Sequence, residues 1–281
     1  MDIDQDLIRE ADRLPASPKL LASVIRLLRD PDANASAVAD LIKKDSTISS
    51  KILKIGHSGY YSMPSSNMDI GRAILHIGLL ETYRIVSGLI GRQMASQPIE
   101  AYNMHEEEFF YHSLCVAIAN EKLAKRLHHD AIDNYTIGLF HSMGKLLVST
   151  LFAEDYPKVI EMRDQKSISQ SEAERTVLGC DFAMASAVLL EYWKFPESIY
   201  APVKAQFFPY EENDYQEAAC MLHFSLAIID GLDLTELGSR FQYNDYARIM
   251  KHFYMDESDI EALGFEVRSE AESFKQLFDL E

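Results

Sequence analysis

Apolar residues recur every three or four positions along most of the chain, the spacing that places them on one side of a helix. The first stripe follows Pro18 and includes Leu20, Leu21, Val24 and Ile25. Only 12 glycines and 9 prolines interrupt the 281 residues, and no short window alternates as a half-buried strand would. We therefore predict an all-α fold. The predicted helices cover about 20–28, 36–42, 46–56, 69–77, 79–97, 106–128, 131–153, 155–164, 169–178, 182–193, 214–231, 240–253 and 257–279.

The longest loop expected in the first hundred residues is 57–68. Loops of this length in compact helical proteins are often binding surfaces, and exposed aromatic and methionine side chains suit protein contacts. One interpretation makes the loop a surface for a protein partner. The alternative is that its tyrosines fill the junction between two helical lobes, and the pattern leaves both open. The residues concerned are Tyr60, Tyr61, Met63 and Met68.

The formal net charge of −17 is unevenly distributed. Residues 1–100 carry 12 acidic and 12 basic side chains, whereas residues 205–281 alone carry 17 acidic and 5 basic ones. Such a chain repels a phosphate backbone, so we predict no nucleic-acid partner. The same field is unfavourable for an enzyme that takes anionic phosphate esters. It favours a protein partner instead, one with a basic surface.

The cysteines and the hydrophobic runs indicate the compartment. Cys115, Cys180 and Cys220 are odd in number, widely spaced and without a Cys-x-x-Cys pair, which is typical of a reducing cytoplasm. The first residues are acidic rather than basic and apolar as in a signal peptide. The longest apolar run, 135–152, is interrupted by polar residues and is too short to span a bilayer. We predict a cytoplasmic protein without membrane segments.

The first half of the chain resembles the HDOD family, a group of helical domains related to HD metal-dependent phosphohydrolases. The resemblance rests on Leu14-Pro15-Ala16-Ser17-Pro18, on Lys51-Ile52-Leu53-Lys54-Ile55-Gly56-His57-Ser58 and on Ala73-Ile74-Leu75-His76-Ile77-Gly78. The chain departs from the family at Asp45-Ser46, where Asp-Pro is usual, and at Gly56-His57-Ser58, where Ala-Asn-Ser is usual.

The second half continues the resemblance to about residue 210. It contains Tyr111-His112-Ser113, Gly138-Leu139-Phe140-His141-Ser142-Met143-Gly144-Lys145 and Trp193-Lys194-Phe195-Pro196. The resemblance implies a two-lobed multi-helix bundle. We expect an N-terminal helical extension at 1–13, an HDOD-like domain at 14–230 and an acidic helical C-terminal extension at 231–281. Within that domain we expect an N-terminal lobe at 14–98 and a degenerate HD lobe at 105–230.

HD chemistry needs histidines and carboxylates that hold divalent metal and lower the pKa of a bound water. By resemblance, His112 and His141 match the first two histidines of the HD constellation. The positions that resemble its remaining ligands carry neutral or apolar residues, namely Ser142, Phe182, Gln206, Phe207 and Leu226. Two imidazoles without a carboxylate make a weak divalent site. We therefore predict no metal, no cofactor and no catalytic residue, with His112 and His141 as hydrogen-bonded core histidines.

The resemblance implies a non-catalytic output module for bacterial signal transduction that works by contact with another regulatory or signalling protein. Two alternatives stay open. One is a metal-dependent phosphohydrolase of a nucleotide or cyclic dinucleotide. The other is a sensor that binds a nucleotide in the old metal pocket without cleaving it, using Lys145, Gln206 and Phe207.

Overall fold

A computed structural model describes residues 3–14, 17–30, 34–62, 69–96, 99–211, 214–232 and 243–278. Throughout these ranges the chain forms helices and no strand, which confirms the predicted all-α class. The helices are α1 (Ile3–Ala11), α2 (Ser17–Leu28), α3 (Ala35–Ile42), α4 (Ser46–Gly56), α5 (Ile70–Ile77), α6 (Leu79–Ala95), the 3₁₀ helix η1 (Glu100–Tyr102), α7 (Glu106–Arg126), α8 (Ala131–Phe140), α9 (Gly144–Leu151), α10 (Tyr156–Lys166), α11 (Gln170–Leu178), α12 (Phe182–Tyr192), α13 (Glu197–Lys204), α14 (Gln216–Gly231), α15 (Tyr246–His252) and α16 (Glu257–Phe278).

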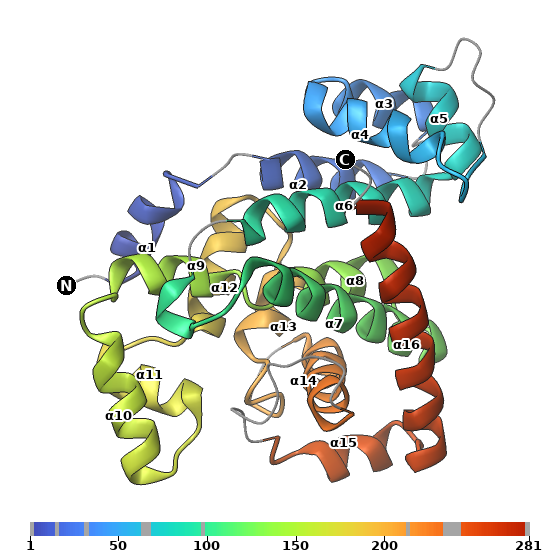
Figure 1. The fold of residues 1–281 in the computed structure, drawn as a ribbon. Helices are drawn as coiled ribbons and strands as arrows, with labels where there is room; N and C mark the ends of the chain where they lie inside the picture. The colour runs from blue at the N-terminus through green and yellow to red at the C-terminus, as the bar shows by residue number, and fades with distance from the viewer. Residues whose placement is uncertain are drawn as a thin grey trace.

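Helices α3, α4 and α5 form a small group at one end of the long helix α6 (Figure 1). Each begins at a side-chain cap that satisfies a free backbone N–H of the first turn. Asn34 caps α3, Asp45 caps α4 and Asp69 caps α5. Their inner faces bury mainly isoleucine, valine and alanine. Short, well-capped helices thus pack together here as a distinct corner of the molecule.

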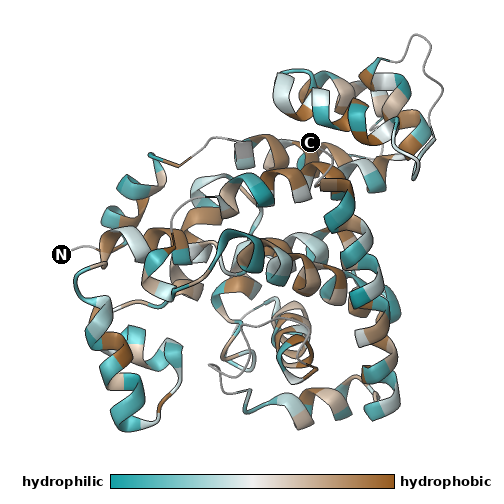
Figure 2. Cartoon of the chain, viewed as in Figure 1, coloured by the Kyte–Doolittle hydropathy of each residue, from teal (hydrophilic) through white to brown (hydrophobic). Residues whose placement is uncertain are grey.

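The centre of the molecule is the antiparallel pair α7 and α8, on which α6, α14 and α16 pack (Figure 1). Gly138 on α8 permits the close approach, because a Cβ there would lie 2.6 Å from the Cα of Ala117 on α7. Figure 2 shows hydrophobic residues concentrated in central helices such as α7 and α14, whereas α10 and α11 are largely hydrophilic. Buried apolar residues from both halves of the chain form one continuous core.

Two predicted details of the helices are wrong. The apolar run 131–153 predicted one helix, but the chain turns at 141–143 between α8 and α9. At this turn the backbone N–H of Gly144 donates to Ser186 Oγ of α12 (2.7 Å), and tertiary packing overrides the local periodicity. The segment after Pro196 forms helix α13 in spite of Pro202, because it packs on α12 and α8.

The two ends of the described chain pack on its second half. Helix α1 contacts α9 and α12, and α16 lies along α7. The division into extensions and lobes at residues 13, 98 and 230 stays a prediction. Within the described ranges no single helix is long and apolar enough to cross a bilayer. Two helix pairs would together be long and apolar enough, but each is sharply bent at the break between its two helices.

Candidate functional site

The two histidines that match the HD constellation lie side by side in the core. His112 is on α7 and His141 caps the end of α8, with ring centroids 5.4 Å apart. His141 Nδ1–H donates to the Gly138 carbonyl (2.7 Å). Burial lowers the pKa of His141 to about 3, and burial, His141 and Lys145 hold the pKa of His112 well below its usual value. Both rings are therefore neutral at pH 7.

Lys145 brings a positive charge into the same region. It is on the first turn of α9, and its side chain is almost wholly buried. The ammonium lies 4.7 Å from the ring centroid of Phe182 and 5.4 Å from that of Tyr102, and it donates to Met104 Sδ at 3.7 Å. Contacts with aromatic faces compensate part of the cost of burying an ammonium group. Lys145 is thus a built-in cation next to the two histidines.

The structure brings most of the replaced ligand positions together around these groups. Phe182 begins α12 and packs edge-to-face on Phe207, with centroids 5.4 Å apart. Gln206 is fully buried and donates from Nε2 to the carbonyl oxygen of His141 (3.1 Å). Ser142 is buried in the turn before α9, and Leu226 is buried on α14, which packs on α7 and α8. Four of the positions that resemble HD ligands are therefore buried neutral or apolar side chains.

Asp230 is a member of this region that the sequence reasoning missed. It accepts a hydrogen bond from the Tyr243 hydroxyl (2.7 Å), and the tyrosine ring packs edge-on against His223. Burial raises the pKa of Asp230 to about 6, although Tyr243 and the charge of Lys145 act in the opposite direction. Helical spacing could have indicated Asp230 from the sequence. It lies four positions after Leu226 and seven after His223, and positions three, four and seven apart share one face of a helix.

Four polar atoms of this region are buried without a hydrogen-bond partner in the described part of the chain. They are Ser142 Oγ, Gln206 Oε1, His223 Nε2 and Asp230 Oδ1. Most buried polar groups in proteins are paired, often with ordered water. These four atoms can therefore form further hydrogen bonds, to water or to a small polar ligand.

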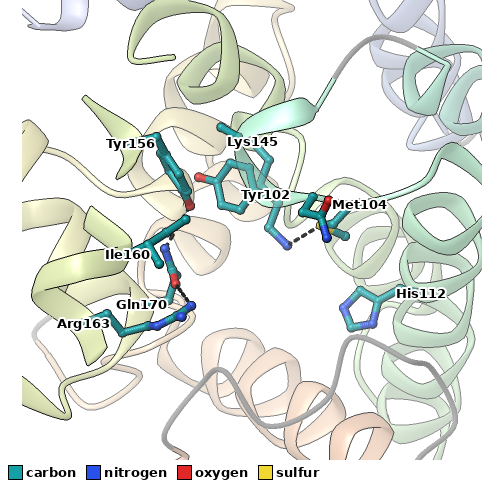
Figure 3. Close-up of a pocket in the computed structure, with 10 residues that line it drawn as sticks. Tyr102, Met104, His112, Lys145, Tyr156, Ile160, Arg163 and Gln170 are labelled. Carbon is teal, nitrogen blue, oxygen red and sulfur yellow. Dashed lines mark hydrogen bonds between the residues drawn. The ribbon is translucent and has the colours of Figure 1, made fainter. Parts of the chain in front are cut away.

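A cavity of about 140 Å³ opens beside the histidines. Figure 3 shows His112 on one side of it, Arg163 and Gln170 of the α10–α11 hairpin on the other, and Lys145 with Tyr102 between them. Of the residues predicted to form a pocket, only Lys145 lines this cavity. Gln206 is buried behind it, and Phe207 lines a separate groove beside α11.

A second buried polar group, Glu174, fixes one wall of the cavity. Its carboxylate accepts hydrogen bonds from the hydroxyls of Tyr102 (2.9 Å) and Tyr156 (2.8 Å) and from the backbone N–H of Phe182 (2.9 Å). Burial raises the pKa of Glu174. Nothing in the local pattern of α11 distinguishes Glu174 from a solvated residue, so the sequence reasoning could not have found it.

The donor set around His112 and His141 does not fit a divalent metal. Among the described residues no group of three or more His, Cys, Asp or Glu side chains is placed to hold an ion. HD-type chemistry needs carboxylate ligands, and the turn after His141 offers a hydroxyl instead. The ammonium of Lys145 adds a repulsive charge.

The predicted partner loop lies far from this region, at the α3–α5 corner. Tyr60 is 60% exposed, whereas Tyr61 is half-buried and donates from its hydroxyl to Glu81 (2.7 Å). Tyr60 is thus open to solvent and Tyr61 is bonded to α6, a helix of the same predicted lobe, and both interpretations of the loop stay predictions. Met63 and Met68 lie outside the described residues.

Known proteins share both the sequence pattern and this arrangement of helices. The HDOD domain matches residues 14–208, nearly the span expected from the motifs. The chain belongs to the HDOD family. A relative from Treponema pallidum (strain Nichols), named an uncharacterized protein, is 21% identical over 273 residues, which are 96% of this chain and 50% of the relative. The chain therefore spans about half the length of that relative.

Solved structures show the same HDOD fold. A protein from Marinobacter aquaeolei VT8, provisionally named a signal transduction protein, has a TM-score of 0.75 at 17% identity over 99% of this chain and 65% of its own. An HDOD domain protein of unknown function from Geobacter sulfurreducens has a TM-score of 0.69 at 18% identity, covering 98% and 97%. A protein from Shewanella amazonensis SB2B, provisionally named a phosphohydrolase, has a TM-score of 0.70 at 22% identity, covering 97% and 98%. At these identities the likeness shows the fold alone.

Proposed function

We propose that this HDOD protein is a non-catalytic signal-transduction module that acts by contact with another regulatory protein. Its family and the signal-transduction name of the Marinobacter protein fit a signalling module. The non-catalytic part of the proposal rests on the chemistry of the degenerate pocket.

The buried ammonium of Lys145 is the observation that carries the proposal. It lies against Phe182 and within the electrostatic reach of His112, His141 and Asp230. A divalent cation between the two imidazoles would be repelled by this ammonium, and the two imidazoles are neutral ligands that bring no negative charge of their own to the cation. Without metal, the HD reaction has no activated water.

Metal analysis tests this proposal. The full chain, purified without chelators, should contain divalent metal far below one ion per chain and should not hydrolyse nucleotides or cyclic dinucleotides when manganese, iron or magnesium is added. Stoichiometric metal that is lost in His141→Ala, together with hydrolysis, would establish the phosphohydrolase alternative and overturn the proposal. Retained folding of His141→Ala by circular dichroism is the control.

The second candidate, a sensor of a small ligand, is supported by the four buried polar atoms that have no partner in the described residues. The adjoining cavity of about 140 Å³ is smaller than the roughly 300–1,000 Å³ typical of ligand sites, so it fits a small anion better than a nucleotide. Thermal-shift measurements with cyclic dinucleotides and with phosphate separate the functions. Stabilisation by several degrees that disappears in Lys145→Met would favour the sensor. We expect no shift with cyclic dinucleotides.

A further inference from the structure

The α3–α5 corner, at one end of α6 in Figure 1, differs in charge from the rest of the molecule. Residues 35–77 carry five basic and three acidic side chains, a net charge of +2, in a chain whose net charge is −17. The remainder of the chain therefore carries −19. Two surfaces of opposite sign on one protein attract different partners, because complementary charge steers encounter and rejects like-charged surfaces.

The basic side chains of this corner gather on and beside helix α4. Lys51 and Lys54 are three positions apart and so lie on one face of the helix, and Lys44 is exposed in the turn before it. Lys43 is paired with Asp40 at 3.1 Å. Lys44, Lys51 and Lys54 form no ion pair with any side chain that the structure describes, so their charges are free to meet a partner.

Exposed apolar side chains lie on the segments that follow α4 in the chain and pack beside it. Leu75 is 73% exposed, Tyr60 60% and Leu80 41%. Hydrogen bonds hold the segments that carry them together. His76 Nε2–H donates to the carbonyl of Tyr61 (2.9 Å), and the Tyr61 hydroxyl donates to a carboxylate on the first turn of α6, next to Leu80. The segment that carries Tyr60, helix α5 that carries Leu75 and the start of α6 are therefore held against one another, and α4 packs on both α5 and α6.

Resting on the proposed function, we propose that this surface is where the protein partner docks, and that the partner presents an acidic segment with apolar side chains, in place of the basic surface that the net charge of the chain favours. We name the surface the α4–α5 face and define it by Lys44, Lys51, Lys54, Tyr60, Leu75 and Leu80. A central aromatic and aliphatic patch edged by charges is the usual composition of a protein-binding surface. The sign of those charges sets the partner, because lysines on one helix face favour aspartate and glutamate opposite them.

The same observations decide against two other occupants. Nucleic-acid interfaces are strongly positive and polar, whereas this face is only weakly positive and exposes two leucines. A second copy of the chain could offer its own acidic half. That contact would join different surfaces of the two copies and would build rings or open chains rather than a two-fold symmetric dimer.

Site-specific photocrosslinking in the native host tests the proposal. Leu75 of the full chain is replaced by benzoylphenylalanine, cells are irradiated, and the crosslinked peptide is identified by mass spectrometry. We expect a crosslink to one protein, at a segment with an excess of Asp and Glu. Lys51→Glu combined with Lys54→Glu should lower the crosslink yield and the affinity for the purified partner roughly tenfold. Lys166→Glu combined with Lys251→Glu makes the same change in net charge on exposed residues elsewhere and should leave both unchanged.

The remaining outcomes overturn this docking surface. One is a crosslink to nucleic acid, to a second copy of the chain or to a basic segment. The other is a crosslink yield that stays the same when Lys51 and Lys54 are replaced by Glu. A second probe at Phe265, which is 77% exposed on α16, separates this failure from failure of the proposed function. Protein crosslinks from Phe265 but none from Leu75 would retain a contact-based function and reject the α4–α5 face. The absence of protein crosslinks from both positions would reject both.

Discussion

Single residues decide the chemistry of the degenerate pocket. Where a metal-binding relative needs carboxylates, this chain has Ser142 and Phe182, and Lys145 supplies a fixed positive charge in their midst. The positive charge of Lys145 acts to lower the pKa of Asp230, yet burial raises that pKa to about 6. Charge is therefore costly at this position even with a cation in reach.

Replacing Asp230 tests that cost. The folded protein binds a proton at Asp230 more tightly than the unfolded chain, so this group favours folding at low pH, and that contribution is lost as pH rises from about 4 through 6. Asp230→Asn removes the charge and keeps the shape. The melting temperature should rise by several degrees at pH 7.5, for a gain on the order of 1–3 kcal/mol, and the gain should shrink at pH 4.5. Glu261→Gln, at an exposed position, is the control and should show no such pH dependence. Equal gains at both pH values would contradict the argument.

Helix-to-helix contacts position the pocket. The turn between α8 and α9 sets His141 beside His112, and it depends on the close packing of α9 on α12. A Cβ at Gly144 would overlap the carbonyl oxygen of Phe182 and the backbone nitrogen of Ser186. Backbone atoms cannot rotate away as a flexible side chain can, so the two helices would have to separate.

Gly144→Ala should therefore destabilise the protein by about 1–3 kcal/mol or more, measured as the midpoint and slope of urea unfolding. Gly231→Ala is the matched control, because an added Cβ at the end of α14 meets no atom of another described segment within 4 Å. That variant should be neutral or stabilised by about 0.5–1 kcal/mol. Equal effects of the two substitutions would mean that the α9–α12 contact does not depend on Gly144.

At the scale of the whole molecule, one buried arginine joins three distant parts of the chain. Arg84 on α6 is 7% exposed and forms an ion pair with Glu121 of α7 (3.2 Å) and another with Glu270 of α16. Its guanidinium also lies 4.6 Å from the ring centroid of Phe274 on α16. The N-terminal half, the central helix and the last helix thus share a single charged contact.

Arg84→Met should leave Glu121 buried without this partner and cost about 3–5 kcal/mol. Hydrogen exchange should rise first in α16, because this helix loses the ion pair of Glu270 with Arg84 and the contact of Phe274 with the same guanidinium. Arg126→Met breaks an exposed pair between α7 and α16, Arg126 and Asp259 at 3.1 Å, and should cost no more than about 1 kcal/mol. Similar losses in both variants would show that burial of Arg84 is unimportant.

The sequence by itself determined the all-α class and the family. Helical periodicity is a local property of a chain, and short motifs such as 73–78 and 138–145 can be read without a structure. The identity of residues at the ligand positions was equally readable, so the sequence alone predicted that Ser142 replaces a carboxylate. The break of 131–153 at His141 was not readable, because it arises from contact with α12, more than forty residues away.

Only the tertiary structure decided what surrounds those residues. It brought Lys145 against Phe182 and placed the Tyr243 hydroxyl on Asp230, contacts between segments that have no fixed relation in sequence. The surface charge shows the same limit. Residues 1–100 carry no net charge, although the α3–α5 corner within them is positive, because the carboxylates that balance it lie in other segments. A count of charges along the chain gives only their sum. A partner contacts the charges that lie on one surface, and folding determines which side chains lie there together.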